Sequence, residues 1–385
     1  MFLFSEMEPL RDANTTFALE LFKKMCEKDP KKNVLLCPMA LSSSMAVINK
    51  GAKENTSAQI GKTLHFDTAG DVNLGYQSLD KDLTKPTITC ALKQANRIYG
   101  DNSIKILPEY LEASKKYNTQ VEQVEFGNEA ESDATRQKIN DWVKEKTEGK
   151  IEELLKKDCF SSKTKLLLVN AGIFKGIWET KFDEANTKEC PFQLSKTESK
   201  PVQMMQQEGT YRMTTIDDVM TTIIELVINK DLGMLILLPK EIDDESTGLE
   251  KLTKELTCEK YNTWTNPSKM INSNVKISIP KFTLDETYRL KEVFTNMGLS
   301  EPFNEETADF TGITSSGGLA LSEIIHKSVL QVGEEGNETT STGGGFRSRL
   351  LLRKEEVVAD HPFCFIIHHR RNRSILAIGK LCCPN

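Results

Sequence analysis

The sequence predicts an α+β protein, with helices in its first half and strands in its second. Apolar residues recur at helical spacing up to about residue 160, whereas short apolar and alternating runs, typical of strands, dominate beyond it. The 385 residues contain no internal repeat or linker, and Gly343–Gly345 is the only low-complexity stretch. Helices followed by strands are typical of the α+β class. At 38% hydrophobic residues the chain can bury a large core, and we expect a single domain over residues 1–385.

The first half supplies the expected helices, each with its own signal. Asn14 or Thr15 can cap a helix over 17–25, and Pro108 can begin one that runs to residue 117. Residues 33–38 predict a short strand that ends at a proline. The remaining expected elements are helices over 41–49, from 55 onward and over 132–147, and a strand over 91–99.

The second half supplies most of the expected strands. They cover residues 165–170, 221–227, 233–238, 275–280, 320–332, 363–367 and 375–379. Two helical segments, near 247–257 and 286–298, interrupt them.

Composition excludes several partners. The net charge of −6 is spread over both signs without a long basic block, so we expect no nucleic acid. No apolar run approaches the ~20 residues of a membrane span, and the N-terminus lacks the features of a signal peptide. Nine scattered cysteines favour reduced thiols. We therefore expect a monomer in the cytoplasm, with the nucleus as an additional location.

Catalytic motifs are missing from the chain. It has no Gly-x-Ser-x-Gly, no glycine-rich phosphate loop and no His-Glu-x-x-His. The five histidines lack the spacing of metal ligands, and the adjacent His368 and His369 would face opposite sides of a strand. We expect no enzyme activity, no metal and no cofactor.

The most informative stretch runs from His326 to Ile367. A strand-like run that ends at Glu335 leads into a small and polar tract over 336–345 and then into apolar and basic residues up to Arg353. A second strand-like run begins near His361. Loops between strands are usually short, and one of about twenty-five residues is usually functional or disordered. The composition here suggests a loop that can become a strand.

This arrangement resembles the hinge and reactive-centre loop of the serpins, because Glu334, Glu335, Gly336 and Glu338 match the family's hinge. Further matching runs, in the family's order, are Gly51–Thr56, Leu168–Glu179, Ile279–Phe282, Ala308–Gly312 and Ile325–Ser328. The chain is most similar to the intracellular ovalbumin-type (clade B) group, which includes leukocyte elastase inhibitor and granzyme-inhibitor-like members.

The resemblance implies the serpin fold, about nine helices on three β-sheets with an exposed reactive-centre loop near 334–356. It also implies a serine protease inhibitor that acts as a suicide substrate. The protease forms an acyl-enzyme at the scissile bond, and the cleaved loop inserts as a strand into the main sheet. The implied hinge residues are Glu334, Glu335, Gly336, Asn337, Glu338, Thr339, Thr340, Ser341 and Thr342.

Insertion requires every second loop residue to become buried. The inward set is Asn337, Thr339, Ser341, Gly343, Gly345 and Arg347. Asn337 is uncharged, whereas the glycines are poor strand formers and a buried Arg347 would be costly. A non-inhibitory serpin with a binding or chaperone-like role therefore remains the alternative.

The family's spacing from Glu334 puts the reactive bond between Leu350 and Leu351. Leucine there implies a chymotrypsin-like protease as partner. A shift of one residue gives the Arg349–Leu350 bond and a trypsin-like partner, and a papain-like cysteine protease is a further alternative.

Five residues are implied to control opening of the main sheet. Asn170 and His326 lie in apolar strand-like runs, and the resemblance places them in a hydrogen-bond cluster called the shutter. Cys37 and Ala40 stand at two positions where the family usually has serine. Both are poorer hydrogen-bond formers than serine, so we expect a weaker shutter and a sheet that opens more easily. Trp178 matches the tryptophan of the breach, where the loop begins to enter, and Lys327 belongs to the matched run beside His326.

Overall fold

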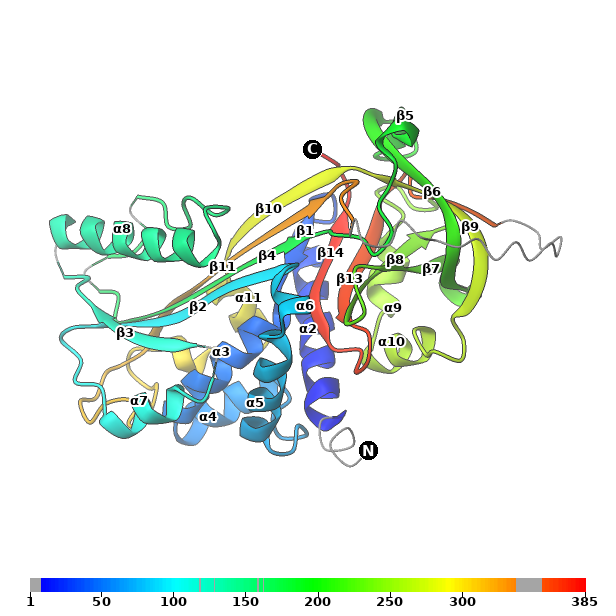
Figure 1. Ribbon diagram of the computed structural model, residues 1–385. Coiled ribbons are helices and arrows are strands. Elements are labelled where there is room, and N and C mark those ends of the chain that lie inside the picture. Colours follow the sequence, from blue (N-terminus) through cyan, green and yellow to red (C-terminus); the bar gives the residue numbers. More distant parts are fainter. Residues whose placement is uncertain (1–7, 118, 128, 158, 162, 337–354) are drawn as a thin grey trace. The chain divides into compact units, whose positions relative to one another are not determined.

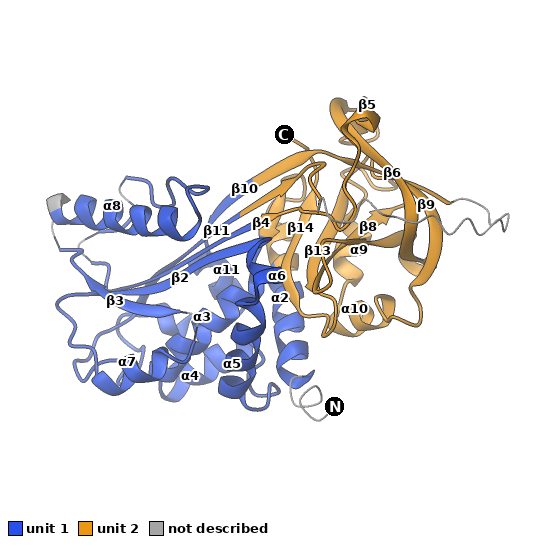
Figure 2. Ribbon diagram, in the orientation of Figure 1, with its two compact units in different colours: residues 1–21, 36–173, 285–328 blue, residues 22–35, 174–284, 329–385 orange. Residues whose placement is uncertain are grey.

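The computed structural model describes residues 8–117, 119–127, 129–157, 159–161, 163–336 and 355–385 (Figure 1). These residues form ten α-helices and two hydrogen-bonded β-sheets. Figure 2 shows two compact units: unit 1 comprises residues 1–21, 36–173 and 285–328, and unit 2 comprises residues 22–35, 174–284 and 329–385.

Local sequence signals explain where five of the ten described helices begin. Prolines stand at the first turn of α3, α6 and α7, where the missing N–H costs nothing. Side-chain oxygens of Asp71 and Thr257 cap α5 and α10. The helices are α2 (Glu8–Lys28), α3 (Pro38–Gly51), α4 (Glu54–Thr63), α5 (Val72–Leu83), α6 (Pro86–Thr89), α7 (Pro108–Ser114), α8 (Glu129–Lys146), α9 (Glu250–Glu255), α10 (Cys258–Trp264) and α11 (Lys291–Asn296).

The expected cap at Asn14 or Thr15 is wrong, because α2 already begins at Glu8. Both residues are buried inside the helix. The Asn14 Oδ1 atom accepts hydrogen bonds from the Ser42 hydroxyl (2.8 Å) and the Tyr76 hydroxyl (2.8 Å). The polar side chain that looked like a helix start therefore serves tertiary packing instead.

The first sheet has five strands in the order β10-β11-β4-β2-β3. They are β10 (Phe282–Arg289), β11 (Leu321–Val332), β4 (Leu166–Lys175), β2 (Leu92–Asp101) and β3 (Gln120–Val124). Strand β4 is buried from Leu166 to Phe174, and β11 is buried along most of its length. Strands covered on both faces are usually near-continuous apolar runs, and β4 shows this pattern, whereas β11 carries several polar residues among its apolar ones.

The second sheet has nine strands, in the order β1-β14-β13-β8-β7-β6-β9-β12 with β5 paired to β6. They are β1 (Val34–Leu36), β14 (Ile375–Leu381), β13 (Phe363–His369), β8 (Leu232–Pro239), β7 (Thr221–Val227), β6 (Ser199–Ile216), β9 (Ile271–Pro280), β12 (Glu355–Val358) and β5 (Lys188–Gln193).

The sheet count differs from the three that we expected, because one strand joins two groups of strands. Strand β6 is 18 residues long and pairs with β5, β7 and β9. Hydrogen bonding therefore continues through β6 without a break, and two of the three expected sheets merge into one ladder.

The helix expected near 286–298 begins later than predicted. Residues 282–289 continue as β10 with alternating burial, and α11 covers only Lys291–Asn296. Alternation with period two is the strand pattern, and pairing within the sheet decides the conformation of this segment.

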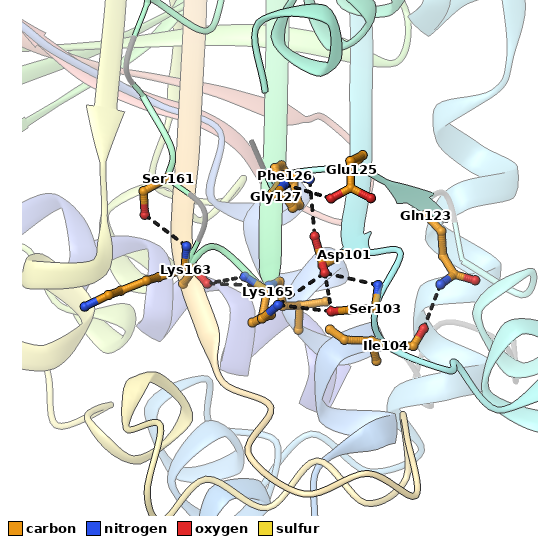
Figure 3. A network of polar contacts seen from close by, with 12 residues as sticks. Asp101, Ser103, Ile104, Gln123, Glu125, Phe126, Gly127, Ser161, Lys163 and Lys165 are labelled. Carbon is orange, nitrogen blue, oxygen red and sulfur yellow. Dashed lines mark hydrogen bonds and ion pairs between the residues drawn. The ribbon is translucent and has the colours of Figure 1, made fainter. Parts of the chain in front are cut away.

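A buried carboxylate fastens the end of β2 (Figure 3). Asp101, whose side chain is 4% exposed, accepts hydrogen bonds from the backbone N–H groups of Ser103 (3.1 Å) and Phe126 (3.2 Å). Its Oδ1 atom also meets the Ser103 hydroxyl and the Lys165 ammonium, at 3.2 Å from the latter. Burial raises the pKa of Asp101, but these hydrogen bonds outweigh it and hold the pKa below its usual value. The network ties the end of β2 to the residue that precedes β4.

Candidate functional site

The residues implied by the family resemblance fall into three groups. Asn337–Thr342 of the hinge and the reactive-bond candidates Arg349, Leu350 and Leu351 lie outside the described residues. Four described residues, Cys37, Asn170, His326 and Lys327, belong to unit 1. Trp178 and the hinge residues Glu334, Glu335 and Gly336 belong to unit 2.

A chain of hydrogen bonds crosses from β11 to β4 in unit 1. The His326 Nδ1 atom on β11 lies 2.5 Å from the Asn170 Oδ1 atom on β4, and the Asn170 amide donates onward to Asn96 Oδ1 on β2. On the other side of the imidazole ring, the His326 Nε2 atom accepts from the backbone N–H of Cys37 (3.1 Å) and lies 2.9 Å from the Ser328 hydroxyl. We call these residues the shutter: Cys37, Asn96, Asn170, His326 and Ser328.

The partners of His326 define its tautomer. Because Nε2 accepts the Cys37 N–H, the ring proton lies on Nδ1 and is donated to Asn170. The ring is fully buried and stacks on Tyr288, with ring centroids 6.3 Å apart. Burial lowers the pKa of His326 to about 3, so the imidazole is neutral at physiological pH.

Cys37 takes part in the shutter through both its backbone and its thiol. Its Sγ atom lies 3.2 Å from the Ser328 hydroxyl, and burial raises the pKa of the thiol to about 12. A Cβ atom added at Gly172 would lie 2.9 Å from this sulfur, which is closer than any normal contact. The absence of a side chain at Gly172 therefore leaves the room that the Cys37 sulfur occupies.

Lys327 points away from the shutter along β11. Its ammonium group contacts Asp285 and lies 3.3 Å from the Thr287 hydroxyl, and both partners are on the neighbouring strand β10. The residue therefore binds β11 to its outer neighbour rather than to β4.

In unit 2, Trp178 holds the chain that leaves β11. Its indole Nε1 donates to the Gly333 carbonyl (2.7 Å), and its backbone N–H donates to the Glu335 carbonyl (3.0 Å). The Phe182 N–H donates to the Glu334 carbonyl (3.1 Å), and the rings of Trp178 and Phe182 pack edge to face. The first hinge residues are thus bonded through their backbone as well as their side chains.

Gly336 pairs with Trp178 in a parallel bridge. At Gly336 the chain still runs in the direction of β11. To pair with β11 as a neighbouring strand, it would have to turn back. A Cβ atom at Gly336 would lie 2.6 Å from the backbone N and Cα atoms of Lys181. Only glycine allows this approach, because backbone atoms cannot move aside as a flexible side chain can.

Glu334 is anchored by two side chains. It is 8% exposed, and its carboxylate accepts from the Lys281 ammonium (2.8 Å) and the Thr187 hydroxyl (3.0 Å). Burial raises the pKa of Glu334, but the Lys281 hydrogen bond and its neighbours bring it below the usual value. Glu335 forms a more exposed ion pair with Lys175 (2.6 Å).

Sequence reasoning missed several of these partners. Asn96 and Thr187 were not candidates, and Gly172, Lys281 and Ser328 entered only as parts of matched runs. Lys281 lies within the matched Ile279–Phe282 run, which is the one signal that could have drawn attention to it. Asn96 and Thr187 lie far in the sequence from the residues that they contact, Asn170 and Glu334, and no local pattern marks them.

Several other features bear on the class of protein. No group of side chains in the described part of the chain could hold a metal ion. All nine cysteines are free thiols. Among the described helices, none is long and apolar enough to cross a membrane.

Comparison with known proteins identifies the family. Residues 12–384 match the family described as Serpin (serine protease inhibitor), so the chain belongs to the serpins. Serpin B5 of Homo sapiens is 43% identical over 380 residues, which cover 98% of this chain and 100% of that protein. Leukocyte elastase inhibitor of Equus caballus is 42% identical over 381 residues, covering 98% and 100% of the two chains.

Solved structures agree with this assignment. A crystal structure of maspin superimposes with a TM-score of 0.92 at 42% identity, covering 99% of this chain and 100% of that one. Uncleaved ovalbumin gives a TM-score of 0.87 at 31% identity, covering 97% and 100%. The expected α+β serpin fold and the likeness to the clade B group are confirmed.

Proposed function

We propose that this chain is a protease inhibitor that acts as a suicide substrate through its loop at about 334–356. The serine Oγ of the protease attacks the carbonyl carbon of Leu350, and the bond to the Leu351 nitrogen breaks. The new amine takes a proton from the protease histidine, and an ester joins Leu350 to the enzyme. The cleaved loop then enters the five-stranded sheet and carries the protease with it.

The observation that carries this proposal is the seam between β11 and β4. The loop follows β11 directly, and β4 is the neighbour of β11 in the sheet. A strand that turns back after Gly336 would run beside β11 and would have to separate it from β4. The hydrogen bond from His326 to Asn170 crosses this seam, so the shutter must break for the loop to enter.

The hinge contacts supply the second barrier. Insertion requires loss of the Gly336–Trp178 bridge and of the backbone bonds that Trp178 and Phe182 donate. These few bonds are each worth about 1 kcal/mol, whereas a complete inserted strand forms many. This difference in the number of hydrogen bonds supports a loop that enters the sheet only after cleavage has freed its end.

The protease class follows from the residue at the reactive bond. Leu350 suits the apolar pocket of a chymotrypsin-like serine protease, and Arg349 suits a trypsin-like one. A papain-like cysteine protease is the third candidate. We propose a monomer in the cytoplasm, with the nucleus as an additional location. A non-inhibitory binding or chaperone-like role remains the alternative, favoured by Asn337 and the glycines at 343–345.

The test is incubation of the purified chain with chymotrypsin, trypsin or papain, followed by denaturing electrophoresis and mass mapping of the cut. A complex that survives denaturation supports the trap, and the mass of the released C-terminal fragment distinguishes Leu350 from Arg349. Clean cleavage by all three proteases without any such complex would support the non-inhibitory alternative.

A further inference from the structure

Unit 2 contains a cavity of about 860 Å³ that none of the loop, shutter or hinge residues lines. Three segments form it: residues 23–31 at the end of α2, residues 246–254 around α9, and Lys380 of β14. Its volume lies in the usual range for small-molecule sites.

Lys380 places a buried positive charge in the cavity wall. The residue is 1% exposed, and its ammonium donates to the backbone carbonyls of Asp29 (3.2 Å) and Pro30 (2.6 Å). An ammonium carries three N–H donors, and the described residues supply acceptors for only two of them. Lys380 forms no ion pair with any described carboxylate, although a buried charge normally requires one.

The acidic residues of the wall are engaged elsewhere. The Asp29 carboxylate pairs with Lys32 (2.9 Å), and the Glu27 carboxylate pairs with Lys24 (2.9 Å). Neither of these two lysines lines the cavity. Glu250, the remaining acidic residue of the lining, is exposed to solvent.

The nearby thiols do not supply a negative charge. Burial raises the pKa of Cys26 to about 12 and that of Cys382 to about 11, and in both cases it outweighs the opposing effect of Lys380. Both groups are therefore neutral thiols at physiological pH. Among the residues that the structure describes, none supplies a counter-ion for Lys380.

The rim and walls add positive charge and apolar surface. Lys31 and Lys254 are exposed lining residues without an ion pair in the described structure. Leu249, Pro30 and the Cys26 thiol contribute apolar surface, and the Ser246 hydroxyl is buried without a hydrogen-bond partner. The stems of the lysines extend this surface while their charges stay at the opening.

We infer that this cavity binds a small organic carboxylate with an apolar body, whose head group is held by Lys380 with help from Lys254. The carboxylate supplies both the missing acceptor and the missing counter-ion, and the apolar body replaces water along the walls. The inference is independent of the proposed inhibitory function, because it requires neither the loop nor a protease.

The test measures binding of decanoate to the full chain by isothermal titration calorimetry, below the concentration at which decanoate forms micelles. The matched probes are 1-decanol, which lacks the charge, and inorganic phosphate, which lacks the apolar body. We expect saturable binding of one decanoate per chain, with decanol and phosphate at least about tenfold weaker. Equal affinity for decanol, or no saturable decanoate binding, would overturn the assignment.

Two variants on the same helix locate the site. Lys254→Glu reverses a charge at the rim, whereas Lys251→Glu makes the same change at an exposed position of α9 that does not line the cavity. We expect Lys254→Glu to weaken decanoate binding about tenfold and Lys251→Glu to change it less than about twofold. Equal effects of the two variants would contradict the site. Lys380→Met should abolish decanoate binding. If the Lys380→Met chain misfolds, the comparison of Lys254→Glu with Lys251→Glu still tests the site.

Discussion

The fit between Cys37 and Gly172 allows a quantitative test of shutter packing. In Gly172→Ala the new Cβ atom would lie 2.9 Å from the Cys37 sulfur, roughly 0.7 Å inside a normal contact. The site is fully buried, and overpacking of this kind costs about 1–3 kcal/mol of unfolding free energy. Serine at position 37 carries a smaller atom on a shorter bond, so Cys37→Ser should remove most of that cost.

The assay is a double-mutant cycle from denaturant unfolding of the wild type, both single variants and the double variant. We expect the cost of Gly172→Ala to fall by about 1 kcal/mol or more when residue 37 is serine. Gly61→Ala in α4 is the control, because a Cβ atom there meets nothing within 4 Å. It should be neutral or stabilising.

A cost of Gly172→Ala that does not depend on residue 37 would refute the packing argument. The same data test whether Cys37 weakens the shutter. If it does, Cys37→Ser alone raises the thermal midpoint through a stronger hydrogen bond to Ser328, and an unchanged midpoint would count against that idea.

Three further predictions follow from the described contacts. The pKa of His326 is about 3 in the folded chain and near 6.5 in the unfolded chain. Between pH 6.5 and pH 3 only the unfolded state gains a proton, so the free energy of unfolding falls as the pH falls. The loss is about 2 kcal/mol between pH 6.5 and 5, and His326→Gln should remove this part of the slope in unfolding titrations. Gly336→Ala should push the hinge off Lys181 and speed hydrogen exchange at the Trp178 amide, and an unchanged exchange rate would contradict the close approach. Because the pKa of Asp101 is lowered in the folded chain, its carboxylate stabilises the fold above the pKa of the unfolded state, and this stabilisation is lost as the pH falls through the folded pKa. Asp101→Asn should therefore make the free energy of unfolding depend less on pH at acid pH. An unaltered pH dependence would argue against the network.

The strands buried in the sheets were the easiest elements to predict. Thr221–Val227 was expected with the bounds that β7 shows, because a short apolar run enclosed by turns has few other conformations. Strand β6 was missed because only four of its 18 residues are buried, and its partners β9 and β7 hold it in place. Local pattern fails where pairing between distant segments decides the conformation.

The candidate site divides in the same way. Asn170 and His326 stood out because polar side chains in apolar runs require partners, and Trp178 stood out through its match to the family's motif. The contacts of Asn96 with Asn170, of Gly172 with Cys37 and of Lys281 with Glu334 could not be predicted, because each joins segments that are distant in the sequence. The closeness of Gly172 to Cys37 is a matter of tenths of an ångström, which no sequence pattern encodes.

The most direct test of the account compares the thermal unfolding midpoints of the intact chain and of the chain cleaved within residues 337–354. If the cleaved loop enters between β11 and β4, it adds a hydrogen-bonded central strand, and the midpoint should rise by more than about 10 °C. Slower hydrogen exchange in β4 and β11 should accompany the rise. An unchanged midpoint with unchanged exchange would show that the loop does not insert, and would contradict the proposed mechanism of inhibition.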